Sequence, residues 1–137
     1  MKGSGAADSV YGEIVFGSFA LAVLKIATRK FGASSVAVWA ALWRHHLRRD
    51  DDAAASETLQ RALRTALPAR ERVGATVRFG LDEYELGSAE RGRTVLEGVV
   101  AAYPRRLDVW TLFIDKETKG GHVDQARALL QRLASLK

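Results

Sequence analysis

Two glutamates and two arginines recur at one spacing in this sequence. Glu83 precedes Arg93 by ten residues, and Glu117 precedes Arg127 by the same interval. Paired carboxylates can act as general acid and base when their surroundings separate their pKa values. An arginine beside each glutamate instead indicates an ion pair, because a partly buried carboxylate without a cation is costly. We interpret each pair as structural, fixing how the two helices of one unit meet, and expect Arg127→Ala to destabilise the fold more than Arg105→Ala.

The three histidines of the chain are His45, His46 and His122, and the first two precede an acidic run at residues 50–52. Histidines and carboxylates are common metal ligands, but neighbouring residues on a helix point about 100° apart and do not converge on one ion. We expect no metal site, no cofactor and no catalytic residue in this chain.

Arginines near the ends of the predicted helices are the candidate contacts for a phosphate backbone or an acidic partner. Arginine suits both because its planar group carries several hydrogen-bond donors. Along one edge of the fold these residues would form a basic stripe. The alternative is scattered solvated charge, because many of them have Asp or Glu within four residues. The candidate contacts are Arg44, Arg48, Arg49, Arg72, Arg78, Arg105 and Arg106.

The segments that carry these residues repeat along the chain. Trp39, Thr76 and Trp110 occupy one position of the repeat, at offsets of 37 and then 34 residues. A period of this size indicates stacked supersecondary units. The aromatic residues could stack on bases, but their recurrence at helical spacing favours a place in the core. The repeat signature consists of Trp39, Leu42, Phe79, Glu83, Arg93, Trp110, Phe113, Glu117 and Arg127, with Pro68 and Pro104 closing the first two units.

Each unit divides into two helices. Apolar residues recur at helical spacing in both halves of a unit, and a glycine or an acidic turn separates the halves. A similar pattern at about 11–31 lacks a partner helix. We therefore predict an all-α fold, a right-handed α-solenoid of about three helical hairpins plus one N-terminal orphan helix. The domain spans 9–137, with units at about 33–68, 69–104 and 105–137, after a flexible leader at 1–8.

Two of the units depart from the repeat. In the first unit, His46 replaces the glutamate and Ser56 replaces the arginine of the other two units. In the middle unit, Gly98 stands where Arg61 and Arg132 stand in the others. Contacts made by these side chains elsewhere in the repeat are therefore absent from those units.

The composition excludes several classes of protein. The chain has 137 residues, of which 47% are apolar, and carries a formal net charge of +5. This length suits one domain, and the lack of cysteine excludes disulfides, iron–sulfur clusters and thiol catalysis. No apolar run approaches the roughly 20 residues of a membrane-spanning helix. The positive charge favours nucleic acid or acidic protein surfaces, and an arginine-rich solvated surface explains it equally well.

The repeat resembles the half-a-TPR (HAT) repeat, in which an aromatic-rich first helix with a Glu precedes an Arg-bearing second helix and a Pro. A closer resemblance, to the C-terminal HAT domain of the family of ribosomal-RNA-processing protein five, also called programmed cell death protein eleven, covers nearly the whole chain. Its most specific part is the run ERGRTVLEG…YPRRLDVW…DKETKGG, within 90–121. This resemblance implies a nuclear and nucleolar assembly factor for both ribosomal subunits, which binds precursor rRNA and other nucleolar proteins without catalysis.

From this resemblance we expect a scaffold module that acts in pre-rRNA processing and ribosomal subunit assembly. Its partners would be ribosome assembly proteins and precursor rRNA, with no membrane contact, and the exposed ends of the solenoid could pair in a homodimer. The alternative is a HAT-repeat module of pre-mRNA splicing or 3′-end processing machinery, since those arrays share the generic pattern.

Overall fold

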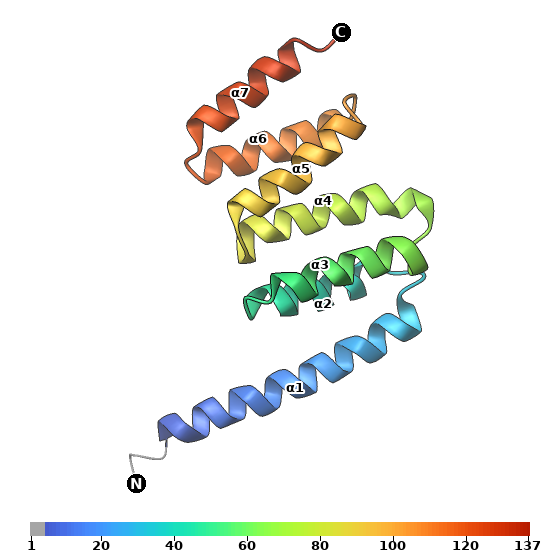
Figure 1. Cartoon of the computed structure of the whole chain (residues 1–137), viewed down its shortest axis with the longest axis vertical. Coiled ribbons are helices and arrows are strands. Elements are labelled where there is room, and N and C mark those ends of the chain that lie inside the picture. The colour runs from blue at the N-terminus through green and yellow to red at the C-terminus, as the bar shows by residue number, and fades with distance from the viewer. Residues whose placement is uncertain (1–4) are drawn as a thin grey trace.

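Seven helices stack along one long axis in the computed structural model, which describes residues 5–137 of the chain (Figure 1). The described residues contain no strand. The prediction of an all-α solenoid with one N-terminal helix ahead of three hairpins is confirmed. The helices are α1 (Gly5–Phe31), α2 (Val36–Arg48), α3 (Asp52–Arg61), α4 (Ala69–Leu86), α5 (Ala89–Ala102), α6 (Leu107–Lys119) and α7 (Val123–Ala134).

Helix α1 begins earlier than the sequence pattern predicted. Residues 1–4 of the expected leader lie outside the described residues, whereas 5–8 belong to α1. Ala6 and Ala7 are strong helix formers, which accounts for the extension toward the N-terminus. At its other end α1 stops at Phe31, just before Gly32.

Local sequence signals set the boundaries of the other helices. The Asp51 carboxylate accepts a hydrogen bond from the Ala54 amide (3.1 Å) at the start of α3, and the Ser88 hydroxyl caps α5. Helix α3 continues through a π-helical turn at Ala62–Ala66, in which the Leu67 amide donates to the Ala62 carbonyl (2.9 Å). Pro68 then ends the helix because the residue before a proline avoids the helical region.

The hairpins are α2–α3, α4–α5 and α6–α7, and each packs on the next. Helix α1 packs on α2, and the first helices of the units follow one another because α4 contacts both α2 and α6. The second helices α3 and α5 both pack on α4 and lie farther apart from each other. This spacing leaves a groove between α3 and α5.

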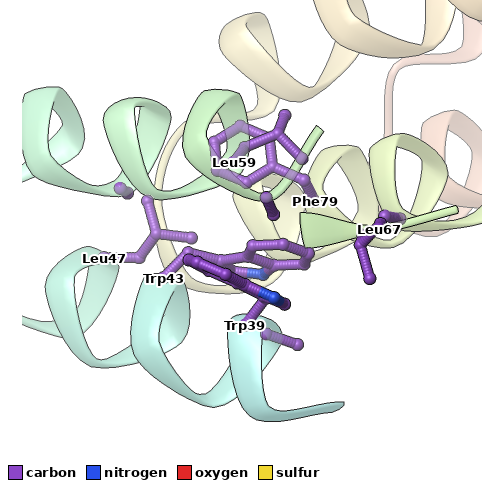
Figure 2. Packing of buried hydrophobic residues seen from close by; sticks show 10 residues of the cluster. Trp39, Trp43, Leu47, Leu59, Leu67 and Phe79 are labelled. Atoms are coloured by element: carbon purple, nitrogen blue, oxygen red, sulfur yellow. The ribbon is translucent and has the colours of Figure 1, made fainter. Parts of the chain in front are cut away.

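Two clusters of buried side chains form the core, one centred on the first two units and one on the last two. In the first cluster the rings of Trp43 and Phe79 meet edge to face with centroids 5.5 Å apart, and Trp39 lies beside them (Figure 2). The second cluster surrounds Trp110 and Phe113. The aromatic residues of the repeat signature are at most 4% exposed, so their rings cannot serve as stacking platforms for bases.

Two glycines of α5 test the packing of the middle hairpin. A Cβ added at Gly92 would lie 2.6 Å from the Tyr84 ring and 2.8 Å from the Gly80 carbonyl, whereas one at Gly98 would meet no atom within 4 Å. We expect Gly92→Ala to lower the free energy of unfolding by about 1–3 kcal/mol through overpacking. Gly98→Ala should raise it by about 0.5–1 kcal/mol through helix propensity. Urea denaturation followed by circular dichroism measures both, and equal effects would contradict the close approach of α4 and α5.

Candidate interaction surface

A buried carboxylate joins the last two units. Glu117 of α6 is fully buried, and its oxygens accept hydrogen bonds from Arg93 Nε (2.8 Å) and Nη2 (3.0 Å) of α5. The Tyr84 hydroxyl of α4 donates to the same carboxylate, and His122 Nδ1 lies 3.3 Å from Glu117 Oε2. Three helices and the loop before α7 therefore meet at one charged side chain.

The predicted pairing of Glu117 with Arg127 inside one unit is wrong. The Arg127 side chain is 65% exposed, and its nearest acid is Asp124 on its own helix, at 3.6 Å. Arg93, which is the repeat counterpart of Arg127, points out of its own hairpin and reaches the glutamate of the unit that follows. No described helix lies beyond α7 to offer Arg127 such a partner.

The pairing predicted for Glu83 with Arg93 is wrong for the same reason. Glu83 is 1% exposed, and its Oε2 accepts hydrogen bonds from Arg91 Nε (3.1 Å) and from the Ser88 amide (3.3 Å). The preceding unit has Ser56 where an arginine would reach forward. Glu83 is therefore held by its own hairpin instead of the previous one.

The charge states at the Glu117 cluster fit a structural role. Burial tends to raise the pKa of Glu117, but hydrogen bonds from Arg93 and Tyr84 outweigh it and hold this pKa below its usual value. Burial, followed by the hydrogen bond to Glu117, raises the pKa of Tyr84 well above its ordinary value. At neutral pH Glu117 and Arg93 form an ion pair and the Tyr84 hydroxyl is protonated.

A second polar joint links the first two units. The Asp82 carboxylate of α4 accepts a hydrogen bond from Trp43 Nε1 (2.8 Å) of α2 and another from Arg44. Arg44 also lies 3.7 Å from Glu85. The positive charge of Arg44, a candidate contact, is thus largely compensated within the fold. Asp82 and Tyr84 were not predicted from the sequence, where nothing but their place beside Glu83 could have indicated them.

The structure brings three of the candidate arginines together. Arg44, Arg48 and Arg78 line a hollow of about 490 Å³ between α1, α2 and α4, together with His45. Burial, and then the nearby charges of Arg49, His46 and Arg48, lower the pKa of His45, so it is neutral at physiological pH. These residues form a basic hollow on the surface.

The remaining candidate arginines lie elsewhere. Arg72 lies at the α3–α5 groove, where its Nε is 3.4 Å from the Leu67 carbonyl. At the start of the third unit, Arg106 forms a bidentate pair with Asp108 (2.8 and 2.9 Å) and Arg105 donates to the Lys137 carbonyl (3.2 Å). Arg49 is exposed at the end of α2. The seven arginines therefore do not form one continuous stripe.

The groove between α3 and α5 is the second hollow of the surface, at about 420 Å³. Its lining is mostly apolar and includes Leu63, Val73, Val95 and Val99. Gly98, which departs from the repeat in the sequence, lies in its wall. An apolar groove of this size can bury side chains of a protein partner.

The described residues offer neither a metal-binding group nor a membrane span. Across 17–137, where the structure describes the side chains, nowhere do three or more His, Asp or Glu gather as metal ligands would. None of the described helices combines the length and the apolar character that crossing a membrane requires.

Comparison with known proteins places the chain in a family. No family model matches it. The human protein named "Protein RRP5 homolog" is 38% identical to it over 100 residues, which is 73% of this chain and 5% of that protein. In fission yeast (Schizosaccharomyces pombe), "rRNA biogenesis protein rrp5" is 39% identical over 99 residues, 72% of this chain and 6% of that protein. The Arabidopsis thaliana protein named "rRNA biogenesis protein RRP5" is 32% identical over 102 residues, 74% of this chain and 5% of that protein.

The chain belongs to the RRP5 family. The predicted resemblance to this family is thereby confirmed over about three quarters of the chain. The chain spans only about one twentieth of the length of these RRP5 proteins. In this chain the hairpins are joined by the Glu117 and Asp82 clusters, and a basic hollow and an apolar groove lie on the surface.

Proposed function

We propose that this chain is a non-catalytic scaffold module of a ribosome biogenesis factor, which acts in pre-rRNA processing and ribosomal subunit assembly. The observation that carries the proposal is its relationship to RRP5 proteins of human, fission yeast and plant, two of which are named for rRNA biogenesis. The module works in the nucleus, at the nucleolus, where pre-rRNA is made. The comparisons support this assignment over the splicing and 3′-end processing alternative.

The proposed mechanism is docking of ribosome assembly proteins on a rigid surface. Its buried acidic groups Glu83 and Glu117 are engaged by arginines of the fold, which supports a structural role for them and a module without chemistry of its own. The apolar α3–α5 groove and the exposed apolar side chains of α1 and α7, including Phe19 (67% exposed) and Leu130 (53%), supply area for protein contacts. The ends of the stack could also pair two copies, which sedimentation of the purified chain would reveal.

A chimera tests the proposed function. The matching 99-residue segment of the fission yeast protein is replaced by this chain, and precursor rRNAs are compared with those of wild-type and segment-deleted strains. We expect the chimera to restore normal processing and the deletion to accumulate precursors. A chimera that is expressed and folded but accumulates the same precursors as the deletion would contradict the proposal.

Contact with precursor rRNA is proposed at the basic hollow. Arg48 and Arg78 form no ion pair with any described residue there, so their charges are available to phosphate. The double variant Arg48→Glu/Arg78→Glu should weaken binding to a structured pre-rRNA fragment and reduce the slope of log K against log salt by about 1.8, because each phosphate that is no longer neutralised accounts for about 0.9. The matched control is Arg105→Glu/Arg106→Glu. Fluorescence anisotropy at several salt concentrations measures both, and equal weakening by the two double variants would show that binding does not use the hollow.

A further inference from the structure

The third unit shows what normally fills the space between successive second helices. The Arg132 guanidinium lies over the Trp110 ring, 5.4 Å from its centroid, and Arg132 Nη1 reaches across to Glu97 Oε1 of α5 at 2.6 Å. The hollow that Arg132 and Glu97 line there measures only about 100 Å³. Indole, guanidinium and carboxylate together fill the space around Trp110, and a separate hollow of about 320 Å³ lies farther along α7, beside Leu107, Leu133 and Leu136.

The groove between α3 and α5 lacks all three side chains. At the equivalent positions, Thr76 replaces the tryptophan, Gly98 replaces the arginine and Gln60 replaces the glutamate. These three residues line the groove, which measures about 420 Å³. A side chain added at Gly98 would enter open space. The groove is therefore open at Thr76 and Gly98 because the middle joint lacks the side chains that fill the space around Trp110 in the next one.

The first unit repeats the arrangement of the third. The Arg61 guanidinium lies 5.8 Å from the centroid of the Trp39 ring, and Trp39 is 4% exposed. Trp39 Nε1 donates to the Gly32 carbonyl (2.9 Å), as Trp110 Nε1 donates to the Pro104 carbonyl (2.9 Å). In both units the indole fills the space and bonds to the loop that leads into the unit.

The loop that leads into the middle unit also has a carbonyl that can accept a hydrogen bond. The Leu67 carbonyl, directly before Pro68, meets only Arg72 Nε at 3.4 Å among the side chains that the structure describes, a long and weak hydrogen bond. Arg72 lies on the rim of the groove.

We propose that the α3–α5 groove binds a tryptophan side chain of a partner protein, which takes the place that Trp39 and Trp110 hold in the other units. The inference deepens the proposed docking function and rests on it, because it names the chemistry of the docked partner. The apolar lining favours an indole, and aromatic anchors dominate the energy of protein interfaces. A nucleotide fits less well because Arg72 is the one cationic residue of the lining.

Nuclear magnetic resonance with a small indole probe tests the proposal on the intact chain. The ¹⁵N-labelled protein is titrated with N-acetyl-tryptophanamide and, as a matched control, with N-acetyl-leucinamide. We expect saturable shifts at the amides of Thr76, Val95, Gly98 and Tyr103 for the indole probe, and clearly weaker ones for the leucine probe. Because the probe is titrated directly, this readout is independent of pre-rRNA processing, so failure here and failure of the chimera are distinguishable.

Two substitutions should act in opposite directions. Thr76→Trp fills the groove from within the chain, so it should abolish probe binding and raise Tm by about 3–6 °C. Gly98→Arg restores only the guanidinium, which can stack on a docked ring, so it should tighten probe binding by about two- to fivefold.

Several results would overturn the proposal. They are probe shifts that persist in T76W, shifts centred on α1 or α7, and equal binding of adenosine monophosphate at the same amides. If T76W does not fold, the proposal is tested with G98R alone. Unchanged or weaker probe binding in G98R would contradict the proposal, because it would show that the docked indole does not lie beneath the new guanidinium.

Discussion

Replacing Arg93 with alanine is expected to lower the free energy of unfolding by about 2–3 kcal/mol. The substitution leaves the Glu117 carboxylate buried without its bidentate partner, and removal of one member of a buried ion pair typically costs about 3–5 kcal/mol. The expected value lies at or below the lower end of that range because 27% of the Arg93 side chain is exposed. Urea denaturation followed by circular dichroism at several pH values measures the decrease.

The matched control is Arg127→Ala, at the equivalent position of the next unit. Arg127 is 65% exposed and faces only Asp124 at 3.6 Å, so its removal should change the free energy of unfolding by no more than about 0.5 kcal/mol. Equal decreases for the two variants, or a larger decrease for Arg127→Ala, would contradict the Arg93–Glu117 pair and support the pairing of Glu117 with Arg127 within one unit.

The pH dependence of Arg93→Ala follows from Glu117. Its pKa is held below its usual value in the fold, so this group stabilises the wild type above its unfolded pKa, and the contribution is lost as the pH falls through the folded pKa. Without Arg93, burial should raise this pKa instead, and the folded state then gains stability as the carboxyl group is protonated. The deficit of Arg93→Ala should therefore shrink between about pH 7 and about pH 4, and a deficit that stays constant or grows would contradict this assignment.

The second large effect is expected at Trp43. This side chain is fully buried, meets Phe79 edge to face and donates to Asp82 (2.8 Å). Trp43→Ala should cost about 4 kcal/mol through the cavity it creates, and Trp43→Phe about 1–2 kcal/mol because the hydrogen bond to a buried carboxylate is removed.

An exposed apolar residue serves as the control for Trp43. Leu130→Ala, at a position 53% exposed, should change the free energy of unfolding by about 0.5 kcal/mol or less. All three variants are compared by urea denaturation with far-ultraviolet circular dichroism, which does not depend on tryptophan fluorescence. Trp43→Phe as stable as the wild type would show that the hydrogen bond from Trp43 to Asp82 does not stabilise the joint between the first two units.

The hairpins could be predicted from the sequence because their signals are local. Apolar residues at helical spacing define the helices, and Pro68, Gly87 and Gly121 mark where they end. The extension of α1 to Gly5 and the π-helical turn before Pro68 were not predicted. In both cases the helix continues beyond the last residues that clearly indicate it, and the residues there do not specify where the helix ends.

The partners of the buried charges could not be predicted in the same way. The sequence places Glu117, Arg93 and Arg127 on their helices but says nothing of the rotation of one hairpin against the next. That rotation turns Arg93 toward the following unit and leaves Arg127 in solvent. The repeat did carry one sign of this arrangement: Ser56 replaces the arginine in the first unit, and Glu83 of the next unit accordingly uses Arg91.

The groove was partly visible in the sequence. Thr76 and Gly98 break the repeat at positions where the other units have tryptophan and arginine. That Gln60 of the preceding unit lines the same opening follows only from how α3, α4 and α5 are arranged around it. The structure explains these departures from the repeat because it shows that the three residues line the same groove.

The claim that the hairpins are locked to one another across unit boundaries can be measured by a double-mutant cycle on Arg93→Ala and Glu117→Gln. A coupling free energy of about 1.5 kcal/mol or more between these two positions, with less than about 0.5 kcal/mol for the parallel cycle on Arg127 and Glu117, is the predicted result. Coupling between Glu117 and Arg127 but not between Glu117 and Arg93 would contradict it.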